Sequence, residues 1–371
     1  MKPMRAARLL TILLIAAVAS CGPLPRGAAV RGEIERDTID TAGYAYYPVT
    51  RALLPTLDAW PAVNVERSYG WPKAGGGSIG RILAPGDVVG ITIWESSENS
   101  LLTSAGARNA NLGSMVISPR GTVFLPYAGE VRIAGMAPDR ARSVLQARID
   151  SIAAAAQVQL SAQAGRSNSV DLVSGVASPG TFPLTDRNTS VLSLISQGGG
   201  IPPTMRNPRV KLQRGHKIFA TSVDRLYDNP ALDSVLRGGD KVIVEEDERY
   251  FLALGATGTE KIVYFDRDYV TALEAISMVG GILDSRADPE GILVLREYPR
   301  AALGAGLRGP REQRVVFSID LTEADGLFSA KNMQIYPQDV VLATESPVST
   351  LQVALGLIGT TFGLANAVAS N

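Results

Sequence analysis

The stretch that decides the fold occurs twice, as Val170-Asp171-Leu172-Val173-Ser174-Gly175 and as Tyr250-Phe251-Leu252-Ala253-Leu254-Gly255. An apolar helix with a glycine stop follows each copy: VLSLISQGGG at residues 191–200 and ALEAISMVGG at residues 272–281. The final glycines of the two strands are 80 positions apart and those of the two helices 81, so a single-residue gap aligns both landmarks. The repeat predicts two related units of strand, turn, strand and helix, with glycines as C-terminal helix caps.

An aspartate that precedes a β-branched strand marks the boundaries of these units. It is Asp87 in LAPGDVV (83–89), Asp240 in LRGGDKV (236–242) and Asp339 in IYPQDVV (335–341). Aspartate side chains accept hydrogen bonds from nearby backbone N–H groups and so stabilise turns. Because all three have similar neighbours, we interpret them as structural turn residues rather than catalytic acids.

Upstream of the repeat, the pattern predicts a mixed segment of strands and one helix. β-Branched and apolar runs predict strands at residues 88–94, 115–117 and 122–125, and alternation predicts another around Val158 and Leu160. Pro138 begins a helix that we expect to reach about Ala154, with Ala141, Leu145 and Ile149 on its apolar face. Residues 22–80 show little periodicity and predict a linker with an irregular start. The fold class is therefore α+β.

The N-terminus has the pattern of a secretion signal. Lys2, Arg5 and Arg8 precede an apolar run from Leu9 to Val18, which is too short for a stable membrane span. Val18-Ala19-Ser20-Cys21 closes the run and resembles a bacterial lipobox, in which the cysteine is acylated. We therefore predict a signal peptide over residues 1–20 and lipidation of Cys21, which would anchor the chain through several acyl chains.

Composition excludes several function classes. Basic and acidic side chains balance at 36 each, which gives no basic field for nucleic acid. The chain has one histidine, His216, and one cysteine, so we predict no metal site, no cofactor and no Cys–His or Ser–His–Asp catalytic residues. A pair of carboxylates of the glycosidase kind stays open, although no segment singles one out.

The last 26 residues, 346–371, carry no charge. A helix of this length would measure roughly 39 Å, enough to cross the hydrocarbon core of a bilayer. Small and polar residues recur on one face at helical spacing: Gln352, Gly356, Gly359, Gly363 and Asn366. An apolar face is formed by Leu351, Leu355, Ile358 and Phe362.

Three interpretations of this C-terminal helix stay open. It packs on its own domain, with glycines permitting close approach; it dimerises in the membrane through small residues; or it joins a ring of helices. In a ring, the polar face lines a watery lumen and the apolar face meets lipid. A single copy in lipid would leave Gln352 and Asn366 without partners, which a ring avoids.

Taken together, these motifs resemble the outer-membrane polysaccharide export family. The resemblance rests on Cys21, on residues 83–94, and on Ile117-Ser118-Pro119-Arg120-Gly121-Thr122-Val123-Phe124-Leu125-Pro126 with the Gly129–Gly135 stretch. The repeats resemble soluble-ligand-binding β-grasp domains, the first through Gly175-Val176-Ala177-Ser178-Pro179-Gly180-Thr181-Phe182. The second repeat departs from the pattern, with Gly258 near the expected Pro-Gly turn and an insertion around residues 301–311.

The resemblance implies an organisation along the chain. It comprises a signal peptide (1–20), an N-terminal linker (21–80), an export domain (81–165), two β-grasp domains (166–247 and 248–345) and a C-terminal membrane helix (346–371).

It also implies a function without catalysis. A homo-oligomeric ring, lipid-anchored in the outer membrane with most of each chain in the periplasm, would pass capsular or exopolysaccharide outward. Its lumen would be lined by the small, polar face of the C-terminal helix, and its partner would be an inner-membrane polysaccharide co-polymerase or ABC-type exporter. The alternative is a periplasm-facing lipoprotein that binds a soluble ligand or glycan without forming a pore. A glycan hydrolase of the envelope is a more distant third.

Overall fold

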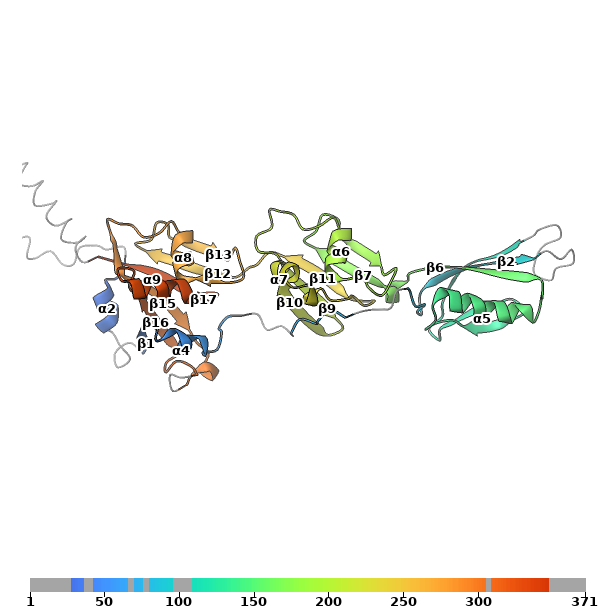
Figure 1. Ribbon diagram of the computed structural model, residues 1–371, viewed down its shortest axis with the longest axis horizontal. Helices are drawn as coiled ribbons and strands as arrows, with labels where there is room; N and C mark the ends of the chain where they lie inside the picture. The colour runs from blue at the N-terminus through green and yellow to red at the C-terminus, as the bar shows by residue number, and fades with distance from the viewer. Residues whose placement is uncertain are drawn as a thin grey trace, which may run out of the picture. The chain divides into compact units, whose positions relative to one another are not determined.

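The protein is seen here as a computed structural model, which describes residues 28–36, 43–65, 70–75, 80–95, 109–304 and 308–346. These residues fall into two compact units (Figure 1). Unit 1 combines the described residues of 1–66 and 248–371, and unit 2 comprises those of 67–247. Helices and strands alternate without a purely parallel sheet in either unit, which confirms the α+β class.

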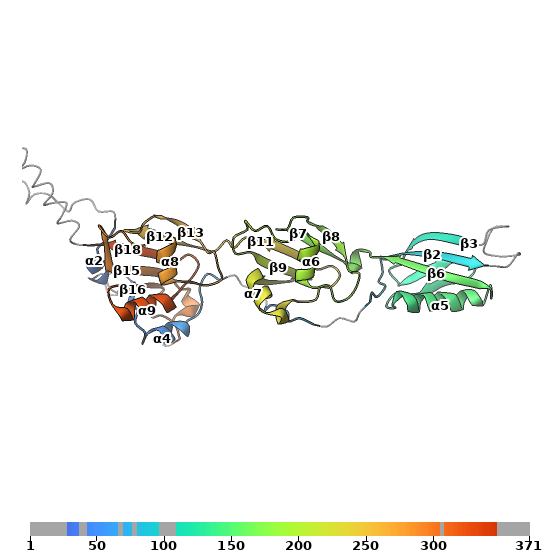
Figure 2. The ribbon, with the colours of Figure 1, turned by 45° about the horizontal axis from the view of Figure 1, so that its top comes forward.

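The first half of unit 2, here named the α5 body, is a three-stranded antiparallel sheet with a hairpin and a helix. Its elements are β2 (Val88–Glu95), β3 (Asn109–Val116), β4 (Thr122–Leu125), β5 (Gly129–Arg132), α5 (Pro138–Asp150) and β6 (Ala156–Gln163). The central strand β2 alternates strictly, so that Val89, Ile91 and Ile93 are buried. They share a core with the apolar stripe of α5, which runs along the sheet (Figure 2).

Helix α5 ends at Asp150, four residues before the predicted end at Ala154. The reason is a pair of hydrogen bonds between one helix side chain and the backbone at the start of β6. Gln146 in the helix donates to the Ala156 carbonyl oxygen and accepts from the Val158 N–H, each at 2.7 Å. The chain must therefore leave the helix early enough for β6 to begin at Ala156.

The second half of unit 2, the α6 body, is a five-stranded sheet in the order β10-β9-β11-β7-β8. Its elements are β7 (Ser169–Ser174), β8 (Gly180–Pro183), α6 (Val191–Gln197), β9 (Arg209–Arg214), β10 (Lys217–Ser222), α7 (Val223–Asp228) and β11 (Lys241–Glu245), with short 3₁₀ turns η1 (Arg166–Asn168) and η2 (Pro230–Leu232). Strand β11 lies between two antiparallel hairpins, β9–β10 and β7–β8, and pairs in parallel with β7. Leu172, Leu194 and Leu212 meet in its core.

The main body of unit 1, the α8 body, repeats this order with one strand added, as β1-β16-β15-β18-β12-β13. Its elements are β12 (Tyr250–Gly255), β13 (Lys261–Tyr264), β14 (Val270–Thr271), α8 (Ala272–Met278), β15 (Ala287–Glu297), η3 (Arg300–Ala302), β16 (Arg314–Ile319), α9 (Ala324–Asn332), β17 (Gln334–Ile335) and β18 (Val340–Glu345). Strand β18 lies parallel to β12 between two hairpins, as β11 lies parallel to β7. The predicted repeat is therefore present as two sheets of matching strand order.

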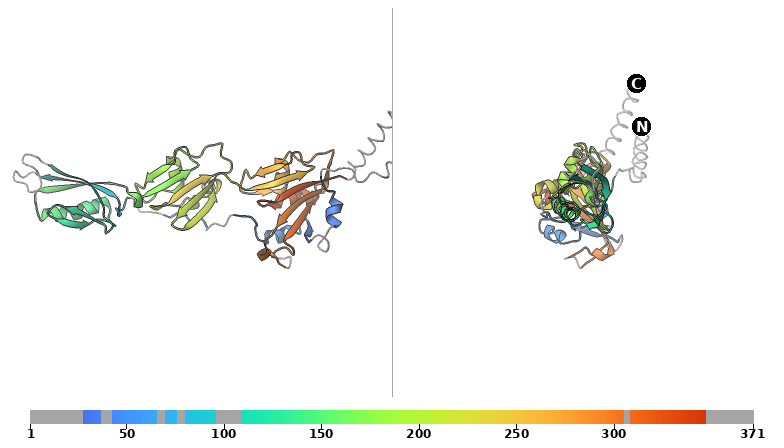
Figure 3. Two further views of the ribbon diagram at one scale, coloured as in Figure 1. Left: turned by 180° about the vertical axis from the view of Figure 1, so that it is seen from behind. Right: turned by 90° about the vertical axis from the view of Figure 1, so that its right-hand side faces the viewer.

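Residues 43–65 belong to unit 1, where the sequence predicted a linker. They supply β1 (Ala45–Pro48), which pairs in parallel with β16, and α4 (Leu54–Asp58); α2 (Arg31–Arg36) precedes them. Trp60 is buried in the unit 1 core. Its ring packs edge-on against the rings of Tyr47 and Tyr298, with 5.3 and 5.8 Å between ring centroids. Figure 3 shows these N-terminal elements, drawn in blue, against the orange and red strands. Long-range pairing, rather than local periodicity, orders this segment.

Candidate functional site

The site residues predicted from the sequence lie outside the described residues. These are the lipidation site Cys21, the small and polar face of the C-terminal helix (Gln352, Gly356, Gly359, Gly363, Asn366) and its apolar face (Leu351, Leu355, Ile358, Phe362). Within the described part of the chain, no helix is long and apolar enough to cross a membrane. No cluster of three or more His, Cys, Asp or Glu side chains suited to a metal is found there either.

The three recurrent aspartates have the turn geometry that the sequence predicted. In each, the carboxylate accepts the backbone N–H of the residue three positions earlier. The distances are 3.0 Å from Ala84 to Asp87, 2.8 Å from Arg237 to Asp240 and 2.8 Å from Tyr336 to Asp339. All three aspartates are buried, and their role in the turns is confirmed.

Each of these carboxylates also has an arginine partner, which the sequence analysis missed. The Arg296 guanidinium donates two hydrogen bonds to the Asp339 carboxylate, at 2.9 and 2.7 Å. The Arg214 guanidinium donates two to the Asp240 carboxylate, at 3.0 and 2.6 Å. The same guanidinium groups also donate to a carbonyl oxygen of the turn region, at Gln334 and Val235 respectively. A bidentate fork of this kind fixes both position and orientation.

The Asp339–Arg296 pair is the most enclosed of the three. Arg296 lies over the Tyr336 ring at 4.2 Å and over the Phe317 ring at 5.2 Å. Burial raises the pKa of the Asp339 carboxyl, and the Arg296 charge and the Tyr336 N–H oppose that rise. Although burial acts to lower it, the pKa of Arg296 is raised, because Asp339 favours the charged guanidinium.

Asp87 binds differently, because it joins the two bodies of unit 2. Its second partners are the Gly165 N–H and the Asn168 side-chain amide, each at 2.7 Å, and Arg81 approaches only to 3.4 Å. Asn168 also donates to the Ile82 carbonyl oxygen at 2.9 Å. The buried carboxylate thus ties the start of the α5 body to the turn that leads into β7.

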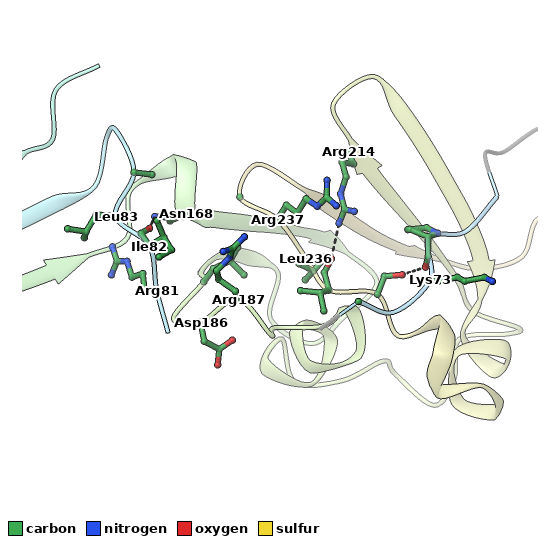
Figure 4. Close-up of a pocket in the computed structure, with 17 residues that line it drawn as sticks. Lys73, Arg81, Ile82, Leu83, Asn168, Asp186, Arg187, Arg214, Leu236 and Arg237 are labelled. Carbon is green, nitrogen blue, oxygen red and sulfur yellow. Dashed lines mark hydrogen bonds between the residues drawn. The ribbon is translucent and has the colours of Figure 1, made fainter. Parts of the chain in front are cut away.

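A pocket of about 580 Å³ opens beside this junction, within unit 2 (Figure 4). It is lined by residues of four chain segments and by the junction itself: Pro72, Lys73, Gly75, Arg81, Ile82, Leu83, Ala84, Asn168, Leu184, Asp186, Arg187, Arg214, Ser234, Val235, Leu236, Arg237 and Gly238. Close backbone packing fixes one side of it. A Cβ on Gly238 would lie 1.7 Å from the Ser167 carbonyl oxygen, a clash that only glycine avoids.

The pocket is strongly basic. Five cationic residues line it, whereas Asp186 is its only acidic lining residue. Arg214 is engaged by Asp240, and Arg81 donates to the Ala162 carbonyl oxygen at 3.1 Å. In Figure 4, Arg81, Arg187 and Arg237 follow one another along the pocket, and Asp186 points away from them. Such a surface is suited to binding anions rather than to acid–base catalysis.

The sequence of this chain is similar to those of several known proteins. Residues 80–163, which coincide with the α5 body, match the family described as polysaccharide biosynthesis/export protein. The capsule polysaccharide export outer membrane protein CtrA of Neisseria meningitidis serogroup A is 26% identical over 289 residues, covering 74% of this chain and 74% of that protein. The capsule polysaccharide export protein BexD of Haemophilus influenzae is 28% identical, covering 77% and 76%.

A further relative has a different type of polymer in its name. The EPS I polysaccharide export outer membrane protein EpsA of Ralstonia solanacearum is 28% identical over 325 residues, which are 82% of this chain and 82% of that protein. These similarities extend well beyond the α5 body and therefore include residues of the α6 and α8 bodies.

Proposed function

We propose that this chain, which belongs to the outer-membrane polysaccharide export family, carries capsular or exopolysaccharide across the bacterial outer membrane. The observation that carries the proposal is the match of the whole α5 body, residues 80–163, to the polysaccharide export family. Relatives named for capsule and EPS I export support it over about three quarters or more of this chain. The role is transport, and we propose that the chain catalyses no reaction and uses no cofactor.

We propose that the α5 body is the export domain and that the α6 and α8 bodies are β-grasp domains. The matching strand orders of their sheets, in which one strand lies between two hairpins and pairs in parallel with one of them, support this assignment. We place the boundaries near residues 165 and 247. Residues 43–65, which complete the sheet and core of unit 1, would then be a part of the second β-grasp domain.

We propose that Cys21 is acylated and holds the protein at the outer membrane, with most of the chain in the periplasm. The support comes from Val18-Ala19-Ser20-Cys21 at the end of the signal peptide and from relatives with outer membrane in their names. An inner-membrane co-polymerase or ABC-type exporter would supply the polymer.

We propose that identical chains form a ring whose C-terminal helices make the pore. The charge-free segment begins at Ser346, directly after strand β18 ends at Glu345, so a helix there would continue from a folded body. Gln352, Gly359 and Asn366 would face the lumen, and Phe362 would face lipid. A periplasm-facing lipoprotein that binds a soluble glycan is the second candidate, favoured by the basic pocket of unit 2.

A deletion strain of the native host tests the export function. We expect it to lose surface polysaccharide, and the wild-type gene to restore it. Phe362→Asp places a charge in hydrocarbon, at a cost of roughly 2.5–3.5 kcal/mol, and should not restore export, whereas Gln352→Asp should. Normal surface polymer in the deletion strain would contradict the function. Equal behaviour of the two variants, with monomeric particles in mild detergent, would favour the binding lipoprotein.

A further inference from the structure

We propose that the basic pocket of unit 2 binds the acidic groups, carboxylate or phosphate, of the exported polysaccharide, with Arg187 and Arg237 as its principal contacts. This inference rests on the proposed function and specifies its substrate class. The pocket would hold an anionic polymer while the chain passes it on, and a neutral glycan would bind poorly there.

The first argument is that some cationic side chains of the pocket make no contact that stabilises the fold. Arg81 and Arg214 have protein partners, as described above. The side chains of Lys73, Arg187 and Arg237 make no hydrogen bond or ion pair with any described residue, and all three are exposed. Arginines that do not support the fold are free to bind a ligand.

The second argument is that the pocket cannot neutralise itself. Its single acidic lining residue, Asp186, accepts the Asn188 N–H at 2.8 Å and the Thr189 hydroxyl at 3.4 Å, and it forms no ion pair with the described cations of the pocket. Asp87 and Asp240 are buried, and each carboxylate is bonded to groups of the protein. Three cations without an ion-pair partner therefore line the pocket, and charges of one sign in a concave site concentrate ligands of the opposite sign.

The third argument concerns the class of anion. Arginine forks match the planar geometry of carboxylate and phosphate. The pocket floor is apolar at Leu83, Leu184 and Leu236, which are buried, so it can accept the C–H face of a sugar beside the charge. The volume of about 580 Å³ lies in the range of sites for small organic ligands. The balanced charge of the whole chain does not favour nucleic acid.

The walls of the pocket are also fixed in advance of binding. Asn168 ties the segment at Ile82 to Asp87, and Gly238 packs directly on the Ser167 backbone. The Trp71 indole N–H donates to the Leu232 carbonyl oxygen at 2.6 Å, which holds the segment that carries Lys73. A preformed site loses less conformational entropy when a ligand binds.

The test uses the purified full chain in detergent and measures binding by isothermal titration calorimetry. The probe is an oligogalacturonate, and the neutral control ligand is a maltodextrin of the same length. We expect the oligogalacturonate to bind, with an affinity that falls as ionic strength rises from about 0.05 to about 0.2 M. The maltodextrin should bind much more weakly. Inorganic phosphate should compete only in large excess.

The decisive variant is Arg187→Gln/Arg237→Gln, which should weaken binding by roughly tenfold or more, or about 1.4 kcal/mol. Its matched control is Arg132→Gln/Arg140→Gln, which removes the same charge from exposed positions on the α5 body. We expect the control to change affinity less than about twofold, because its charges are outside the pocket. Neither double variant removes a contact of the fold, so both should keep the wild-type melting temperature.

Three results would overturn the site: equal affinity of the two double variants, equal binding of maltodextrin, or complete displacement of the oligosaccharide by an equimolar amount of phosphate. None of them would affect the export function, because surface polysaccharide in the deletion strain measures that separately. Conversely, a deletion strain with normal surface polymer would remove the function and leave the calorimetric result as it stands.

Discussion

The α6 and α8 bodies share one strand order, but they differ in how deeply the equivalent arginine–aspartate pair is buried and in what surrounds it. In the α6 body, the side chain of Arg214 keeps 20% of its surface exposed, whereas the side chain of Arg296 in the α8 body keeps 4%. The α8 body also has an added strand, β1, and a fuller cap on its helix. The repeated sequence therefore specifies the framework, and the surrounding residues determine how much each equivalent contact contributes.

The largest difference should appear at the two aspartates. Asp339→Ala leaves the Arg296 guanidinium buried without its partner, and breaking a buried pair on one side costs about 3–5 kcal/mol. We expect hydrogen exchange in β15 and β18 to accelerate accordingly while α5 is unaffected. As a control, Arg296→Met/Asp339→Leu removes both charges and should recover most of the stability. If the double variant is as unstable as the single one, the unpaired charge is not the cause.

The equivalent change in the α6 body should be milder. Asp240→Ala frees an arginine that already reaches solvent, so we expect a loss of about 1–3 kcal/mol in the free energy of unfolding of unit 2. Exchange in β9 and β11 reports it. A loss at Asp240 that equals the loss at Asp339 would show that burial of the arginine does not set the cost.

The helix caps provide a smaller comparison. Thr271 forms a capping box with Glu274 at the start of α8, whereas Ser190 only accepts the Ser193 N–H at the start of α6. We expect Thr271→Ala to cost about 1–2 kcal/mol and Ser190→Ala about 0.5–1 kcal/mol. Thermal unfolding of each variant, followed by exchange in the two helices, measures the difference. Equal losses would mean that the Glu274 side chain adds nothing to the cap.

The smallest expected effect depends on pH. The pKa of Glu274 is lowered, chiefly by the hydrogen bond from the Thr271 backbone N–H. The ionised Glu274 therefore adds its full contribution to the free energy of unfolding above the pKa that this carboxyl has in the unfolded chain. That contribution is lost as the pH falls through the pKa of Glu274 in the folded protein. Compared with Glu274→Gln, the wild type should be more stable at pH 7, and the advantage should shrink in acid. A constant difference at all pH values would exclude ionisation of Glu274 as the source.

Local signals predicted much of this fold. The repeat, the turn aspartates and the strands of the α5 body follow from residues that are close in sequence. The arginine partners were missed because Arg214 precedes Asp240 by 26 positions and Arg296 precedes Asp339 by 43. A usable signal was present, since the two arginines are 82 positions apart, close to the spacing of the repeat. Comparing the ends of the corresponding strands in the two repeats would have shown this pair of equivalent arginines.

The N-terminal strand and the basic pocket could not be predicted for a different reason. Strand β1 pairs with residues about 270 positions away, as in Ala45 with Val315, and no local pattern encodes such a partner. The pocket combines Lys73, Arg187 and Arg237 from three separated segments. Charges that are scattered in the sequence become a site only when the chain brings them together.

The parallel pairing of β1 with β16 sets the order in which the newly made protein can mature. Export through the proposed signal peptide proceeds from the N-terminus, so β1 arrives about 270 residues ahead of β16. All of unit 2 lies between these two strands in the sequence and can therefore fold before β16 arrives. Trp60 and its neighbours pack against later strands of unit 1 and cannot be buried until then. A chain interrupted before residue 319 would therefore present an unfinished apolar core, which is prone to aggregation.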